Sequence, residues 1–205
     1  MPRLYDFLPS GNGYKVRLLL RQLGLPFELV ELDTTKGETR TPAYLAKNPN
    51  GRIPVLELDD GTCLAESGAI LYYLAEGTRF WPADRLQRAR TLQWMFFEQY
   101  SHEPYIAVVR FWRHAGRLTP RQESELPGRV AGGYQALGVM ERHLTGRSFF
   151  VADRYGLADI ALYAYTHVAN EGGFDLGPYP AIGAWLKRVA AEPGHVPITW
   201  RPGAT

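Results

Sequence analysis

Glu66 and Ser67 form a polar pair at a point where the sequence changes from a strand pattern to helical spacing. In the first turn of a helix, carboxylate and hydroxyl side chains can accept hydrogen bonds from backbone N–H groups that have no partner inside the helix. The same turn attracts an anion through those N–H groups and the positive end of the helix dipole. The pair therefore indicates either an ordinary helix cap or a site for a small zwitterionic peptide.

A second polar cluster, Ser10-Gly11-Asn12, lies between an apolar strand pattern and an apolar amphipathic segment. These residue types are typical of a turn that caps a helix, which is the structural interpretation of the cluster. A nucleophilic cysteine would be favoured at such a helix N-terminus, where the dipole lowers its pKa. The single cysteine, Cys63, lies instead in a short strand pattern, and we expect it to be a small buried hydrophobic residue.

The composition narrows the class of protein. One cysteine excludes an intramolecular disulfide and a cysteine-based zinc site, and the five histidines show no metal-binding spacing. With 23 basic residues against 21 acidic ones, the chain is too weakly basic to indicate nucleic-acid binding. Apolar runs fall short of the ~18 residues that a membrane helix needs, and no signal peptide pattern follows Met1. We expect a cytoplasmic protein that uses no metal and binds neither nucleic acid nor membrane.

Hydrophobic spacing predicts the elements that hold the two polar clusters. Strand patterns at residues 4–8 and 27–32 enclose a helical pattern at 14–23, which together predict a βαβ unit. A short helix at 41–47 and a hairpin of strands 55–58 and 62–64 follow, and a helix at 66–76 closes the segment. This order is typical of a thioredoxin-like domain, although order alone does not fix that topology.

The remainder of the chain is almost free of strand patterns. Residues 77–84 have the composition of a turn, and after them apolar residues recur at helical spacing in four stretches, 85–116, 120–145, 157–170 and 180–192. We therefore assign residues 1–77 to a thioredoxin-like domain and residues 85–205 to an all-helical domain.

Three segments of the first domain resemble, in order, the glutathione-binding half of a glutathione transferase. They are Leu4 to Leu18 with its Ser10-Gly11-Asn12 turn, Asn48 to Leu56, and Leu64 to Ile70. In the second half, Phe149 to Ala161 resembles a helix-start element of the same enzymes, with Gly156 in place of the usual capping Ser or Thr and Asp159 three residues later. On these segments the chain is identified as a member of the cytosolic glutathione transferase family, of the bacterial type.

The resemblance implies how the glutathione thiol is activated. A free thiol has a pKa of about 8.5, so the enzyme must stabilise the thiolate. In the resembling enzymes a hydroxyl at the start of the first helix donates a hydrogen bond to the sulfur, and Ser10 matches it. Gly11 allows the backbone to approach the sulfur closely, and Asn12 either adds an amide donor or caps the helix. Tyr5 is the alternative donor, because several subfamilies use a tyrosine of the first strand.

The resemblance also implies which residues of the first domain bind the other groups of glutathione. It implies a cis Pro54, a backbone contact of Ile53 with the cysteinyl unit, and contacts of Glu66 and Ser67 with the γ-glutamyl ammonium and carboxylate. A nearby cation would bind the glycine carboxylate. The implied glutathione-binding residues are Ser10, Asn12, Lys36, Arg40, Arg52, Ile53, Pro54, Glu66 and Ser67.

The acceptor substrate is expected between the domains, against the helix that contains Tyr105, Val109 and Trp112. These residues share one helical stripe, and such a stripe is more often core than ligand site. The expected reaction is conjugation of glutathione to hydrophobic electrophiles in detoxification, or glutathione peroxidase activity, without thiol exchange at an enzyme cysteine. A non-catalytic ligand-binding or protein-interaction module is the alternative. The physiological acceptor cannot be read from the chain.

The resemblance further implies a homodimer. The first domain of one chain would contact the helical domain of the other, and the aromatic and arginine content around Tyr72, Arg88 and Trp94 is expected to be exposed for that contact.

Overall fold

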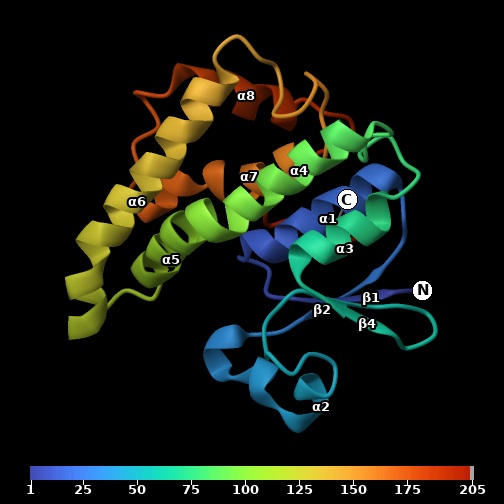
Figure 1. The fold of residues 1–205 in the computed structure, drawn as a ribbon. Coiled ribbons are helices and arrows are strands. Elements are labelled where there is room, and N and C mark those ends of the chain that lie inside the picture. The colour runs from blue at the N-terminus through green and yellow to red at the C-terminus, as the bar shows by residue number, and fades with distance from the viewer. Residues whose placement is uncertain (204–205) are drawn as a thin grey trace. The chain divides into compact units, whose positions relative to one another are not determined.

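The computed structural model describes residues 1–203, which form two compact units. The first contains residues 1–78 and 193–203, and the second contains residues 79–192. Figure 1 shows the chain from its N-terminus in blue to its C-terminal end in red. Among residues 1–203, no helix combines the length and the apolar character needed to cross a bilayer.

The first unit is built on a mixed four-stranded sheet in the order β2-β1-β3-β4. Strand β1 (Arg3–Asp6) pairs in parallel with β2 (Glu28–Glu31) and antiparallel with β3 (Val55–Glu57), which pairs antiparallel with β4 (Cys63–Ala65). Helices α1 (Gly11–Leu23) and α3 (Ser67–Ala75) lie side by side over one face, and the short α2 (Pro42–Leu45) lies on the other side (Figure 1). This arrangement confirms the predicted thioredoxin-like domain.

Alternation along β1 separates the two faces of the sheet. Leu4 points into a core cluster with residues of α1, β3 and α3 and with Phe27, which directly precedes β2. The other members of the cluster are Val16, Leu20, Leu56 and Ile70. Tyr5 points the opposite way, and its ring lies edge-on to Tyr44 of α2 with a centroid distance of 6.1 Å. The apolar face of α1 thus anchors that helix to the sheet and fixes where its N-terminus lies.

The second unit is helical. Its helices are α4 (Arg85–Phe97), α5 (Glu103–His114), α6 (Pro120–Leu144), α7 (Leu157–Thr166) and α8 (Pro180–Ala190), with a 3₁₀ turn at Ala169–Gly172. The sequence has helical spacing over 85–116 and, in His102 and Pro104, the residues of a kink, and a π-helical segment, Glu98–His102, divides the pattern at that place. Pro104 follows this segment, and a proline lacks the N–H that would continue regular α-helical bonding.

Asp159 organises the start of α7. Its carboxylate accepts hydrogen bonds from the backbone N–H of Gly156 at 3.1 Å, from the N–H of Phe150 at 3.1 Å and from Trp185 Nε1 at 2.9 Å. The fold-back of Asp159 onto the cap at Gly156 is therefore confirmed. The side chain is fully buried, and burial raises its pKa to about 7.

The end of the chain differs from the prediction. We assigned residues 85–205 to the helical domain, but residues 193–203 lie in the first unit. Trp200 packs against Phe27 with a ring-centroid distance of 6.3 Å, and the Tyr14 hydroxyl donates to Val196 O at 2.7 Å. Arg201 pairs with Glu31 of β2, where Nη2 and Oε2 are 3.0 Å apart. This apolar contact and these two polar contacts attach the segment to the first unit, although it follows α8 in the sequence.

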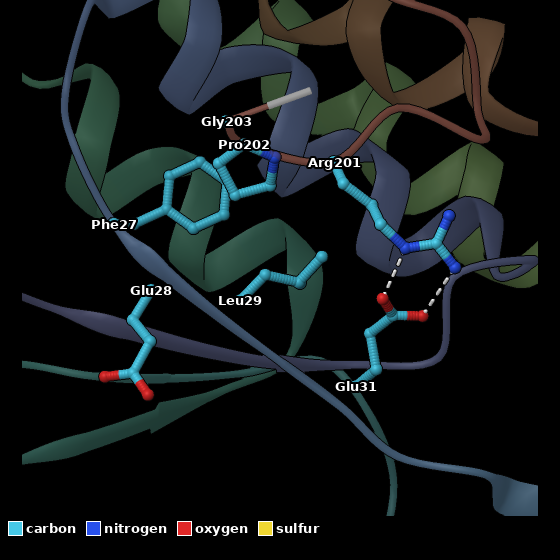
Figure 2. A pocket seen from close by; sticks show the side chains of 7 residues that line it. All are labelled: Phe27, Glu28, Leu29, Glu31, Arg201, Pro202 and Gly203. Atoms are coloured by element: carbon cyan, nitrogen blue, oxygen red, sulfur yellow. Dashed lines mark hydrogen bonds and ion pairs between the residues drawn. The ribbon is translucent and has the colours of Figure 1, made fainter. Parts of the chain in front are cut away.

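A shallow hollow of about 410 Å³ lies between β2 and this terminal segment (Figure 2). The Glu31–Arg201 ion pair spans one side of it. Its lining residues are Phe27, Glu28, Leu29, Glu31, Arg201, Pro202 and Gly203. They include none of the residues that we predicted to bind glutathione.

Candidate functional site

Ser10 is the residue that begins α1. Its backbone is extended (φ −74°, ψ 127°), its N–H donates to Phe7 O at 2.7 Å, and its Oγ accepts from the N–H of Gly13 at 3.4 Å. A hydroxyl has one donor and two acceptor lone pairs, so a hydroxyl oxygen that caps the helix can still donate its proton to a ligand. The half-exposed Ser10 therefore combines a helix cap with a hydrogen-bond donor at the positive end of the helix dipole.

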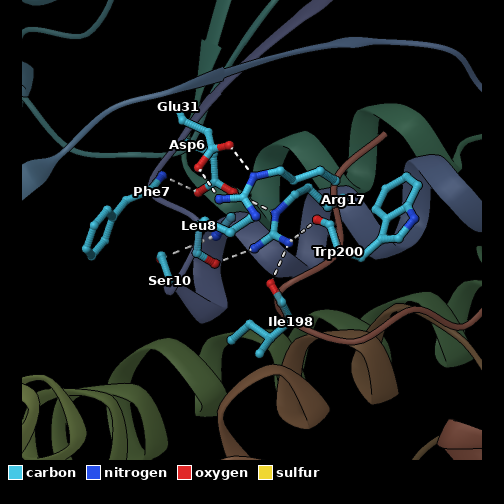
Figure 3. Close-up of polar contacts among 10 residues, drawn as sticks. Asp6, Phe7, Leu8, Ser10, Arg17, Glu31, Ile198 and Trp200 are labelled. Atoms are coloured by element: carbon cyan, nitrogen blue, oxygen red, sulfur yellow. Dashed lines mark hydrogen bonds and ion pairs between the residues drawn. The ribbon is translucent and has the colours of Figure 1, made fainter. Parts of the chain in front are cut away.

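Behind this turn lies a buried ion pair between Asp6 and Arg17 (Figure 3). Asp6 Oδ2 accepts from Arg17 Nε at 2.8 Å, and Oδ1 accepts from the N–H of Phe7 at 2.7 Å. A Cβ atom at Gly13 would lie 1.6 Å from Asp6 Oδ1, so α1 can pass the carboxylate only with glycine at this position. Burial raises the pKa of Asp6 to about 6, with the Arg17 charge acting in the opposite direction.

Sequence reasoning missed this pair, although a signal was present. An acidic residue ends an apolar strand, and Arg17 interrupts the apolar run of α1 between Val16 and Leu18. Charged residues are rarely fully buried unless they are paired. An acidic residue and a basic residue on two core elements therefore indicate an ion pair between them.

Asn12 connects the first turns of α1 and α3. Its Oδ1 accepts from Lys15 Nζ at 2.7 Å and from Ser67 Oγ at 3.3 Å. Because an ammonium group only donates, the amide oxygen must face Lys15, and the amide NH₂ faces away from it. The alternative in which Asn12 caps the helix is wrong, since Ser10 is the N-cap.

Glu66 and Ser67 lie at the start of α3, as predicted, but their side chains differ in exposure and in capping. Ser67 is buried, whereas Glu66 is exposed and its side chain makes no capping hydrogen bond. Of the two interpretations of this pair, the ordinary helix cap is therefore not observed at Glu66. Glu66 has φ 68° and ψ 114°, and a non-glycine residue held at positive φ is typical of functional sites.

The loop before β3 has the backbone that the resemblance implied. The Ile53–Pro54 peptide bond is cis. Arg52 O accepts hydrogen bonds from the Tyr44 hydroxyl and from Asn48 Nδ2, both at 2.8 Å. These two side chains hold the loop in place. Ile53 lies in this loop, just before β3 begins at Val55.

Two of the three candidate cations, Arg40 and Lys36, differ in their contacts. Arg40 donates to Asn50 O at 3.0 Å, so it lies against the loop that contains Arg52. Lys36 is 72% exposed and forms a surface ion pair with Asp33 at 3.2 Å. The structure thus brings Arg40 together with the loop of the predicted site, whereas Lys36 is engaged with its own 3₁₀ turn.

Tyr5 and Cys63 are both engaged away from Ser10. The Tyr5 hydroxyl donates to Glu57 Oε2 at 2.8 Å, on the sheet face opposite the core. Cys63 is only partly buried, which corrects the expectation of a buried residue, and its Sγ lies 3.7 Å from Gly61 O. Burial raises the pKa of the Cys63 thiol, so this cysteine is a poor nucleophile at neutral pH.

The predicted acceptor residues pack within the second unit. Val109 has no exposed surface. The Tyr105 ring lies against Gly132 of α6, where an added Cβ would be 2.4 Å from Tyr105 Cδ1. The Trp112 ring lies under the Arg129 guanidinium at 4.9 Å. The stripe is therefore mainly a contact between α5 and α6.

The residues predicted to be exposed for a dimer contact behave differently from one another. Trp94 is buried against Phe97 and Phe150, with ring-centroid distances of 5.2 and 4.7 Å, so its expected exposure is wrong. Tyr72 of α3 is 41% exposed, and Arg88 is exposed while its Nε donates to Pro82 O at 2.7 Å.

Two family models match the chain. The model described as the glutathione S-transferase N-terminal domain matches residues 2–76, and the one described as the glutathione S-transferase C-terminal domain matches residues 95–193. The two matches correspond to the sheet-containing unit and to most of the helical unit.

Individual relatives extend over nearly the whole chain. A crystal structure of a glutathione S-transferase from Pseudomonas fluorescens is 54% identical, with a TM-score of 0.93 over 96% of this chain and 98% of that one. The disulfide-bond oxidoreductase YfcG of Escherichia coli is 32% identical over 91% of this chain and 89% of its own length. The nitrogen regulation fragment of the yeast prion protein Ure2p is 26% identical, with a TM-score of 0.84 over 94% of this chain and 93% of the fragment. Ure2p has also been crystallised in complex with glutathione.

Proposed function

Because this chain belongs to the glutathione S-transferase family, we propose that it binds glutathione in its first unit and uses the thiolate to attack hydrophobic electrophiles. The observation that carries the proposal is the convergence of two helix N-termini. Asn12 in the first turn of α1 accepts a hydrogen bond from Ser67 in the first turn of α3. Both positive helix ends therefore face one place, which suits an anionic peptide with a thiolate.

Ser10 is the proposed thiol donor. Its oxygen accepts from Gly13 N, and its proton can still be donated to a ligand at the helix end. A hydrogen bond to a charged sulfur is worth about 1.5–3 kcal/mol, which lowers the thiol pKa and raises the thiolate fraction. The Asn12 amide NH₂, which faces away from Lys15, is the second proposed donor. Tyr5 is less suited, because its hydroxyl donates to Glu57.

The remaining glutathione groups are assigned from the same geometry. The exposed Glu66 carboxylate would pair with the γ-glutamyl ammonium. The Ser67 N–H would hold the adjacent carboxylate, together with the Ser67 hydroxyl once it turns from Asn12. The Ile53 backbone beside cis Pro54 would add the cysteinyl unit as a short strand. Arg52 and Arg40 are the proposed partners of the glycine carboxylate, and Lys36 is a weaker choice because it is largely solvated.

In the conjugation step, the sulfur forms a bond to an electrophilic carbon and the leaving group departs with its electron pair. The thiol proton has already passed to solvent on ionisation. With a hydroperoxide, the same thiolate would attack oxygen, and a second glutathione would complete reduction to an alcohol, water and glutathione disulfide. For the acceptor we retain the partly exposed Tyr105 and Trp112, and we omit Val109 because it is enclosed. We further propose a homodimer that acts in cytoplasmic detoxification.

Retention on glutathione agarose, followed by a chlorodinitrobenzene conjugation assay, tests the proposal. We expect elution with free glutathione and turnover that depends on the protein. A cumene hydroperoxide assay on the same sample measures the peroxidase reaction. Failure to bind glutathione by calorimetry would contradict the proposed function as a whole.

A non-catalytic regulatory module is the second candidate, and the likeness to the nitrogen regulation fragment of Ure2p favours it. The two candidates differ in one measurement. Both allow saturable glutathione binding, but only the transferase raises the fraction of bound thiolate at neutral pH. Binding without a shifted thiol pKa and without turnover would support the module.

A further inference from the structure

Arg17 holds three separate segments of the first unit with one guanidinium group (Figure 3). Its Nε donates to Asp6 Oδ2 of β1 at 2.8 Å, and Nη2 donates to Leu8 O in the following turn at 2.7 Å. Its Nη1 donates to two carbonyl oxygens of the terminal segment, Ile198 O at 2.7 Å and Trp200 O at 3.1 Å. The side chain has no exposed surface.

The chemistry of this contact requires arginine. A guanidinium presents five N–H donors in a fixed plane, and four of them are accounted for by these bonds. Three of the four acceptors are neutral carbonyl oxygens that point at the plane from different directions. A lysine could pair with Asp6, but its compact ammonium could not reach all of these oxygens at once. In this buried place, an acceptor that loses its donor stays unsatisfied.

These bonds hold the turn that precedes Ser10, while Gly13 N and Tyr14 N attach Ser10 itself to α1. Leu8, which Arg17 holds, is two residues before Ser10. The same turn is closed by the Ser10 N–H on Phe7 O, and it is held at its other end by the Phe7 N–H on Asp6. Arg17 thus bonds to the turn at Leu8, and Asp6 bonds to it at Phe7. The Ser10 N–H is connected to the pair through Phe7. The terminal segment in turn supplies half of the bonds that orient Arg17.

We propose that Arg17 is a positioning residue for thiol activation, and that the terminal segment 193–203 holds it in its working orientation. The inference rests on the proposed function, because it assumes that Ser10 donates to the glutathione sulfur. Loss of the segment would let the guanidinium turn towards solvent or Asp6, and the Leu8 carbonyl would lose its donor. The Ser10 hydroxyl would then be displaced from the sulfur, while the binding groups at Glu66, Ser67 and Ile53 would stay in place.

Two variants test the proposal. Arg17→Lys keeps a positive charge beside the buried Asp6 carboxylate, so the carboxylate is not left alone. A chain that ends at Gly194 removes Ile198 and Trp200 and leaves Arg17 unchanged. The matched control is Arg201→Gln, which removes the surface pair with Glu31 and preserves every bond to Arg17. For each protein, the ultraviolet absorbance of bound glutathione thiolate is titrated against pH, and binding of S-methylglutathione is measured by calorimetry.

We expect the pKa of bound glutathione to rise by about one unit in both test variants, which is a tenfold change in the ionisation equilibrium. S-Methylglutathione has no thiol to activate, so its affinity should stay the same, whereas general damage to the site would weaken it as well. Arg201→Gln should match the wild type in both measurements. An unchanged thiol pKa in both test variants would overturn this inference and leave the proposed function intact. Absence of glutathione binding by the wild type would instead contradict the proposed function.

Discussion

The side-chain oxygen of Asn12 accepts a hydrogen bond from the Ser67 hydroxyl at 3.3 Å, across 55 residues of sequence. Lys15 donates to the same oxygen at 2.7 Å from inside α1. The starts of α1 and α3 are therefore linked by side chains as well as by the apolar contact between the two helices. Any ligand held by the first turn of one helix is held at a defined place relative to the other.

Ser67→Ala and Glu66→Ala should each weaken glutathione binding by more than about tenfold, since a charge-assisted contact is worth roughly 1.5–3 kcal/mol. Ser67→Ala also removes a donor from Asn12, so its effect should include a change in the bound thiol. Thermal shift with and without glutathione measures the loss. Ser124→Ala, at an exposed position of α6, is the matched control. Full ligand stabilisation in both variants would place the binding site elsewhere.

Ser10→Ala should raise the pKa of bound glutathione and lower the conjugation rate by roughly ten- to a hundredfold at neutral pH. Tyr5→Phe should leave both nearly intact, because the Tyr5 hydroxyl is bonded to Glu57. The double variant Ser10→Ala, Asn12→Ala shows whether the amide compensates for the lost hydroxyl. If the thiolate titration moves in Tyr5→Phe and stays unchanged in both Ser10 variants, the thiol donor is wrongly assigned.

Gly13→Ala should destabilise the first unit by about 1–3 kcal/mol, because the new methyl group would overlap the Asp6 carboxylate. Gly183→Ala is the control. It lies inside α8, where an added Cβ meets nothing within 4 Å, so it should stabilise the protein by roughly 0.5–1 kcal/mol through helix propensity. Urea denaturation gives both values. Equal effects of the two substitutions would contradict the close approach of α1 to Asp6.

The stability contributed by Asp159 should depend on pH. Its pKa is raised from 3.8 to about 7 in the folded chain, so between these values the unfolded chain releases a proton that the folded chain retains. Its contribution to the free energy of unfolding should therefore be complete below about pH 4 and decrease as the pH rises to about 7. Asp159→Asn removes this titration. The difference in unfolding free energy between wild type and variant should change across this range, and a constant difference would contradict the raised pKa.

Light scattering should give about twice the chain mass of 23.1 kDa at micromolar concentration, if the proposed homodimer forms. Tyr72→Glu adds a charge to an aromatic residue that is 41% exposed on α3, and it should shift the dimer towards the monomer. Phe111→Glu, at a residue of α5 that is 50% exposed, is the comparison at a different exposed aromatic residue. A wild-type mass of one chain would remove the dimer from the proposal.

The sequence predicted what depends on local pattern. Apolar spacing placed the strands around α1, and the turn-forming residues before β3 were assigned correctly. Cis Pro54 was implied by the family resemblance and not by local pattern, which gives only about 5% odds of a cis X-Pro bond. The Asp6–Arg17 pair was missed because its signal, one charge on each of two core elements, is seen only when the two elements are considered together. The kink at His102 and Pro104 could be predicted from the proline, but its π-helical form could not, since a π-helical turn has the same apolar spacing as its flanks to within one residue.

Residues far apart in sequence account for the other differences. The terminal segment has no helical or strand pattern of its own, so only its contacts with Tyr14, Arg17 and Phe27 reveal that it belongs to the first unit. The stripe of Tyr105, Val109 and Trp112 shows the converse. Its spacing predicted an apolar face correctly, but spacing does not distinguish a face that contacts another helix from one that contacts a ligand.

The placement of residues 193–203 affects the order in which the protein can be completed during synthesis. A ribosome makes residues 1–78 first, and the whole helical unit follows before the residues that bond to Arg17 exist. Until then, a nascent first unit has a guanidinium whose carbonyl partners at Ile198 and Trp200 are missing. Of the two units, the one that is begun first is therefore finished after the other, and an intact first unit is found only in chains that have been translated through Trp200.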